Sequence, residues 1–212
     1  TKQVPAITWP TPTPIAYGTA LDGDEFNAQA SVPGSFAYSP VVGTVLPAGA
    51  RLLEVVFTPD DAINYTQATA NVMLTVAPAT LTVTVHDKAK TYGEPNPGLT
   101  YAIAGFVNGD DAGIVVGAPS VATAASQFSD VGQYMITASG GEADNYVFDH
   151  APAALTIQQR ALSITAQNSS RIYGGQNPEF IPIFNGFATG DGPENLDEPP
   201  SLTTTATPAS PV

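Results

Sequence analysis

The chain has 212 residues, with 19 acidic side chains against only 6 basic ones and a formal net charge of −13. This charge argues against nucleic acid as a partner, because such a protein needs clustered Lys and Arg to displace the counterions of the phosphates. The absence of cysteine excludes disulfides, thiolate zinc sites and cysteine nucleophiles. No apolar run approaches the roughly 20 residues that cross a bilayer, so we expect no membrane insertion of this segment.

Short runs of apolar and β-branched residues, separated by Pro- and Gly-rich turns, indicate an all-β protein. Apolar and polar residues alternate with a period of two in residues 70–76 and 81–85, which is the pattern of a half-buried strand. No stretch combines apolar residues at helical spacing with recognisable caps. In chain order, we expect strands at residues 53–57, 70–76, 81–85, 155–157 and 162–165, and a short helical turn after Asp110 and again after Asp191.

The sequence repeats itself at an offset of 81 residues. Residues 81–84 align with residues 162–165, and the register then holds without an insertion. Applied backwards, the same offset places Asn64-Tyr65 on Asn145-Tyr146. The other matched positions are Tyr92-Gly93 with Tyr173-Gly174, Asn96-Pro97 with Asn177-Pro178, Gly105-Phe106 with Gly186-Phe187, and Gly109-Asp110 with Gly190-Asp191.

These matches divide the chain into three modules, residues 1–79, 80–160 and 161–212. The third is shorter, because Val212 corresponds to Val131 and the closing strands of the second module have no counterpart after it. We expect the parent protein to be a longer array, or other copies of the chain to complete this module. Only a few residues join consecutive modules, which limits bending. The sequence therefore predicts an elongated, semi-rigid rod in which neighbouring repeats are one another's partners.

The second module, with Tyr92-Gly93, the loop at residues 105–110 and Asn145-Tyr146, resembles the bacterial MBG domain of the YGX type, and the third resembles the first two thirds of another. The first module, with residues 7–9 and 17–19, is similar to a bacterial Ig-like repeat that often precedes MBG units. The resemblance implies an Ig-like sandwich for the first module. It also implies tandem modules of a large secreted or surface-attached, adhesin-like bacterial protein, with no catalytic residues to transfer.

For the second and third modules, the periodicity leaves open a sandwich or a single grasp-like sheet. Their repeated residues are interpreted as scaffold rather than as a platform that stacks on sugars. We expect the tyrosine rings at 92 and 173 to cap the core, each followed by a Gly that permits positive φ. Tyr146 is expected to tether a crossing loop through its hydroxyl, after Asn145 as a left-handed turn residue.

The most acidic turn, residues 108–111, could in principle supply oxygen ligands to Ca²⁺. The spacing of an EF-hand is absent, and the equivalent turn at 189–191 has lost two of the polar residues. We therefore interpret Asp110 as a cap of the short helical turn, with Ca²⁺ as the weaker alternative and no other cofactor or metal.

The sequence does not indicate an enzyme. Its two histidines, His86 and His150, belong to no recognisable catalytic motif. Lys88 and Lys90 align with Ser169 and Arg171, so an isopeptide bond from a lysine is not expected of the fold.

Two functions follow as hypotheses. The first is a structural spacer of an extracellular array. The second is a module that binds a glycan or a host protein, with Trp9 and Tyr38 as the first candidates for contact. A spacer should pack these two rings into the module, whereas a binding site should expose them in one concave patch.

Overall fold

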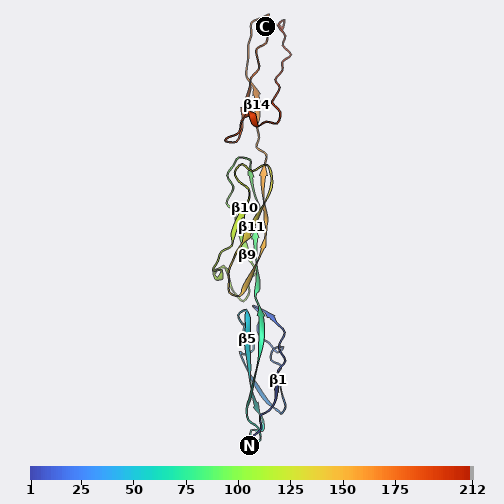
Figure 1. The fold of residues 1–212 in the computed structure, drawn as a ribbon, viewed down its shortest axis with the longest axis vertical. Coiled ribbons are helices and arrows are strands. Elements are labelled where there is room, and N and C mark those ends of the chain that lie inside the picture. Colours follow the sequence, from blue (N-terminus) through green and yellow to red (C-terminus); the bar gives the residue numbers. More distant parts are fainter. Residues whose placement is uncertain (211–212) are drawn as a thin grey trace. The chain divides into compact units, whose positions relative to one another are not determined.

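The structure, a computed structural model, describes residues 1–210 and is all-β, as predicted (Figure 1). The helical residues in this range form two single 3-10 turns. None of the helices among residues 1–210 has the length and apolarity to cross a membrane. The elements are β1 (Ile7–Thr8), β2 (Ile15–Ala16), β3 (Gln29–Ala30), β4 (Gly34–Ser39), β5 (Gly49–Pro59), β6 (Ala68–Ala77), β7 (Ala79–Val85), β8 (Lys88–Thr91), β9 (Tyr101–Ala104), η1 (Ala112–Ile114), β10 (Ser120–Thr123), β11 (Gly132–Ser139), β12 (Tyr146–Ala151), β13 (Ala153–Gln158), β14 (Ser163–Ala166), β15 (Pro182–Asn185) and η2 (Pro193–Asn195).

The first module is built around the long antiparallel pair β5 and β6. They lie in a four-stranded sheet of order β2-β6-β5-β4, and β1 and β3 form a separate pair. Leu53, Val55 and Phe57 on β5 are buried, whereas Glu54 between them is exposed. This alternation follows from the two-residue period of a strand. The strands predicted at 53–57 and 70–76 thus lie within β5 and β6.

The second module has two sheets, of orders β12-β7-β9 and β10-β11-β13-β8. Its strands therefore do not form the single grasp-like sheet that the sequence left open. β7 is parallel to β12 and antiparallel to β9, and β13 is parallel to β8. The strands predicted at 81–85 and 155–157 lie within β7 and β13. β6 passes into β7 through Pro78 alone, so no flexible linker separates the first two modules.

In the third module, the described residues form the antiparallel pair β14 and β15 and the turn η2. The strand predicted at 162–165 overlaps β14. Both 3-10 turns begin just after the acidic loops, η1 after Asp110 and η2 after Asp191. The prediction of a short helical turn at these two places is confirmed.

Residue contacts do not follow the sequence repeats, because the strands of the second module are shared between two compact units. The first unit contains Thr1–His86, Thr100–Ala122 and Thr137–Pro152, and the second contains Asp87–Leu99, Thr123–Ile136 and the chain from Ala153 on. Each unit thus includes one of the two module junctions, at residues 79 and 160.

The core of the first compact unit is continuous across residue 79. It combines side chains from the first module with side chains from the second, so the junction itself is packed rather than solvated. The buried residues of this core are Tyr17, Leu21, Leu46, Leu53, Leu74, Val76, Leu81, Ala143 and Tyr146.

Candidate functional site at the module junctions

At the first junction, two buried tyrosines from different modules meet on one carboxylate. Tyr17 follows β2 in the first module, and Tyr146 begins β12 in the second; the two side chains are only 8% and 7% exposed. Their rings make an edge contact, with centroids 5.4 Å apart and planes at 80°. The Tyr17 hydroxyl donates to Asp110 Oδ2 at 2.9 Å, and the Tyr146 hydroxyl lies 2.8 Å from the same oxygen. Asp110 therefore links the two modules through hydrogen bonds to an ionised acceptor, which are stronger than neutral ones.

The Tyr146 hydroxyl also holds the loop that leads to Asp110, since it accepts a hydrogen bond from the Val107 N–H at 3.1 Å. Burial is the main cause that raises the pKa of Tyr146, and the hydrogen bond and charge of Asp110 raise it further; the bond from Val107 acts in the opposite direction. The phenol therefore stays protonated and can donate to the carboxylate.

Asn145 bridges the same junction through its side chain. Its Oδ1 accepts from the Ala48 N–H at 2.9 Å, and its carbonyl accepts from the Ala79 N–H at 3.0 Å. The prediction of a left-handed Asn145 was wrong, because among the described non-glycine residues only Asn108 has a positive φ, of 57°. The sequence could not show that its amide faces another module.

The interpretation of Asp110 as a helix cap was also wrong. Asp111 is the N-cap of η1, and its Oδ1 accepts from the Gly113 N–H at 2.8 Å. Asp110 is turned away from the helical turn because its carboxylate is held by the two tyrosines. In the third module, the N-cap of η2 is Gly192, which likewise leaves Asp191 outside the cap.

The second junction lies within the other compact unit. It brings together Tyr92 and Asp191, which are equivalent to Tyr17 and Asp110 of the first junction. The pKa of Tyr92 is raised first by partial burial and then by the charge of Asp191 and a hydrogen bond to its carboxylate. Arg160, between the two modules, donates from Nε to the Gly186 carbonyl at 2.7 Å. A cavity of about 180 Å³ lies here, lined by Tyr92, Arg160, Asp191 and apolar neighbours such as Phe187.

The sequence matches the family described as MBG domain (YGX type) over residues 81–156 and 162–212. The chain belongs to this family. The matches cover the second and third modules and leave the first outside, so an Ig-like first module stays a prediction. No curated protein matches the chain.

Two solved structures show how the chain compares with known folds. Drosophila N-cadherin EC1-4 is similar over 74% of this chain and 50% of its own length, with 10% identity and a TM-score of 0.36. The chain thus spans half the length of that fragment. The fibronectin(III)-like modules of CbhA from Clostridium thermocellum are similar over 73% of this chain and 94% of theirs, with 13% identity and a TM-score of 0.28.

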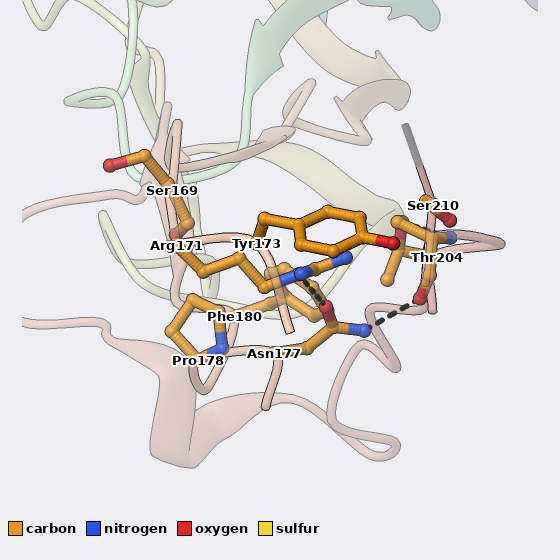
Figure 2. Close-up of a pocket in the computed structure, with 10 residues that line it drawn as sticks. Ser169, Arg171, Tyr173, Asn177, Pro178, Phe180, Thr204 and Ser210 are labelled. Atoms are coloured by element: carbon orange, nitrogen blue, oxygen red, sulfur yellow. Dashed lines mark hydrogen bonds between the residues drawn. The ribbon is translucent and has the colours of Figure 1, made fainter. Parts of the chain in front are cut away.

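The two tyrosines of the MBG Tyr-Gly motif have different surroundings. Tyr92 is half-buried, whereas Tyr173 is 64% exposed. The prediction that both rings cap the core is therefore wrong for Tyr173. Tyr173 lines an open cavity of about 280 Å³, and Figure 2 shows it there together with Arg171, Asn177 and Pro178.

Asn96 and Asn177 hold equivalent loops within their MBG modules. The Asn96 Nδ2 donates to the Ala125 carbonyl at 2.6 Å, and the Asn177 Nδ2 donates to the Ala206 carbonyl at 2.7 Å (Figure 2). The two carbonyls are separated by the same 81 residues as the asparagines. This pair is a structural tether. Its neighbours Pro97 and Pro178 have no hydrogen-bonding role that the structure explains.

A buried cation reinforces this tether and was missed in the sequence. Lys90 is only 6% exposed, and its Nζ donates to the carbonyls of Glu94, Ser126 and Gln127 at 3.0, 2.6 and 3.1 Å. In the third module, Arg171 occupies the equivalent position. It donates to Asn177 Oδ1 at 2.8 Å and to the carbonyls equivalent to those of Ser126 and Gln127, at Thr207 and Pro208. The recurrence of a basic residue at positions 90 and 171 was the feature of the sequence that could have indicated this role.

Close backbone packing explains the repeated glycines at 105 and 186. A Cβ on Gly105 would lie under 3.0 Å from the Thr80 carbonyl oxygen, and one on Gly186 equally close to that of Ala161; both have positive φ. The phenylalanines that follow differ. Phe106 packs edge-on against Tyr146, and Phe187 packs on Phe184. Gly109 and Gly190, at φ of +79° and +96°, form the turns that present Asp110 and Asp191.

The aromatic residues of the first module pack on one another. Trp9 and Tyr38 make an edge contact at 5.4 Å, and Tyr38 stacks on Phe26 at 4.7 Å. The Trp9 Nε1 donates to the Glu25 carbonyl at 2.9 Å, and the Tyr38 hydroxyl accepts from the Ala28 N–H at 3.2 Å. Both polar groups thus have partners inside the module, and both rings are half-buried.

The remaining candidate groups are separate from one another. His86 Nδ1 lies 3.0 Å from Thr100 Oγ1, and His150 Nε2 lies 2.8 Å from the Gly140 carbonyl. Neither histidine lines the cavities described above. Within residues 1–210 no three His, Asp or Glu side chains are grouped closely enough to hold a metal ion.

Proposed function

We propose that this chain is a spacer segment of a large extracellular bacterial protein, in which tandem MBG modules form a stalk that holds other domains away from the cell. The observation that supports this most directly is the first junction. There, Asp110 links Tyr17 to Tyr146 and one core continues across residue 79. A spacer must transmit orientation from one module to the next, and a packed junction does so where a flexible linker would not.

The aromatic residues of the first module also favour a spacer over a glycan-binding module. Trp9 and Tyr38 are the residues on which a sugar would stack, yet each ring packs on other aromatic rings of its own module. Their polar atoms bond to the backbone at Glu25 and Ala28. Exposing them to a ligand would cost these contacts.

A second candidate function is an adhesive one, in which the third module binds a glycan or a host protein. The observation that favours it is the open cavity beside Tyr173, which combines an exposed aromatic ring with the polar side chains of Arg171 and Asn177 (Figure 2). Glycan-array binding that is lost in Tyr173→Ala would support this function. If neither the parent chain nor Tyr173→Ala binds a glycan on the array, the spacer remains the proposed function.

Small-angle X-ray scattering of the full chain tests the spacer. A compact globule of this length has a radius of gyration of about 17 Å, and an elongated stalk should exceed this value clearly. A measured value near that of a globule would refute the proposal. Labelling of intact producing cells, or of their culture supernatant, with an antiserum against the chain tests the extracellular location.

A further inference from the structure

The Tyr-Gly turns of the first two modules contact the following module at equivalent positions. A Cβ placed on Gly18 would lie 2.7 Å from Val107 Cγ2, and one on Gly93 would lie under 3.0 Å from the Ala188 Cβ. Val107 and Ala188 are separated by 81 residues, which is the offset of the repeat. Each glycine therefore lets the backbone of one module approach the same loop position of the next.

The tyrosines of these turns also reach equivalent acceptors. Tyr17 donates to Asp110 at 2.9 Å, and Tyr92 and Asp191 line the same cavity at the second junction. Asp110 and Asp191 are again 81 residues apart. The first module differs from the second in its N-terminal half, but it retains Tyr-Gly there. A pair that contacts the next module explains this retention better than a pair needed within its own fold.

We propose that the Tyr-Gly turn is a docking surface and that its partner is the Gly-Phe-x-x-Gly-Asp loop of the following MBG module, at residues 105–110 and 186–191. The third residue of the loop packs against the glycine, and the terminal aspartate accepts from the tyrosine. This inference rests on the proposed stalk, because it names the residues that fix the angle between consecutive modules.

The third module supplies a matched control within the same chain. Gly174 has the same φ as Gly93, +81°, but apart from its two chain neighbours no described residue has an atom within 4 Å of a Cβ built on it. Tyr173 beside it is 64% exposed. Substitution at Gly174 therefore imposes the same backbone strain as substitution at Gly93 without the clash against a following loop.

Distances between spin labels in the second and third modules test the proposal. The chain has no cysteine, so Met135→Cys on β11 and Ile183→Cys on β15, which replace residues 65% and 50% exposed, place one label in each module. Gly93→Ala should broaden the distance distribution about twofold, as expected when two modules lose their fixed contact. Gly174→Ala should leave the width of the distance distribution equal to that of the parent chain.

Equal widths in Gly93→Ala and Gly174→Ala, whether narrow or broad, would overturn the proposal. If circular dichroism shows that Gly93→Ala does not fold, the widths of the distance distributions in Tyr92→Phe and Tyr173→Phe are compared instead. Each of these substitutions removes only a hydroxyl, and equal widths would again overturn the proposal. A globule-like radius of gyration together with a selective Gly93 effect would refute the stalk and leave the docking surface in place.

Discussion

Replacing Asp110 by Ala should destabilise the first module even though the residue belongs to the second. The substitution removes the oxygen that lies 2.9 Å from the Tyr17 hydroxyl and 2.8 Å from that of Tyr146. Hydrogen bonds to a charged group contribute about 1.5–3 kcal/mol each, and the half-exposed position of Asp110 lets water replace part of this, so we expect a loss of about 2–3 kcal/mol for the pair.

The single tryptophan provides a fluorescent reporter within the first module. Trp9 packs against the core that crosses residue 79, so its fluorescence during urea unfolding reports on the first module. With a slope of about 2 kcal/mol per molar urea, the midpoint should fall by about 1 M in Asp110→Ala. The matched control is Asp111→Ala, which removes the neighbouring carboxylate and only the cap of η1. An unchanged Trp9 midpoint in Asp110→Ala, or an equal fall in both variants, would refute the coupling of the two modules.

Two further predictions concern Lys90 and Tyr146. Lys90→Met removes the buried amine that donates to the carbonyls of Glu94, Ser126 and Gln127 and should lower the unfolding free energy by about 2–3 kcal/mol, as measured by circular dichroism in urea. Lys90→Arg should stay near the parent value, because Arg171 occupies this position in the third module; equal losses would contradict the proposed role. Tyr146 has a folded-state pKa above 10.0, so its contribution to stability is complete below that pH and is lost as the pH rises from 10 through the folded value. Urea unfolding on a pH series should therefore show an alkaline decline that is smaller in Tyr146→Phe, and identical declines would exclude Tyr146 as a source.

The all-β fold could be predicted from the sequence because a half-buried strand repeats its burial every two residues. Leu53, Val55 and Phe57 are buried on β5, and Leu81, Val83 and Val85 on β7, as that period requires. The turns η1 and η2 could be placed for a similar reason, since acidic and glycine residues precede them. These features depend on neighbours in the chain alone.

The candidate site was only partly predictable. The repeat identified Tyr92, Asp110, Tyr146 and Asp191 as positions that matter, but assigned their contacts to the interior of one module. Asp110 was expected to cap a helical turn and instead binds Tyr17, which lies 93 residues earlier. The role of Lys90 was missed because burial of its amine depends on three carbonyls, two of them at residues 126 and 127.

The sequence by itself determined the strand pattern and the family, since the first follows from local periodicity and the second from the repeated motifs. Only the tertiary structure decided which module covers which repeated residue. Tyr92 and Tyr173 stand in the same motif, yet one is half-buried and the other exposed. The physical reason is that Tyr92 lies beside Asp191 and Leu196, about a hundred residues later in the chain, and a residue's own neighbours in sequence contain no information about such distant contacts.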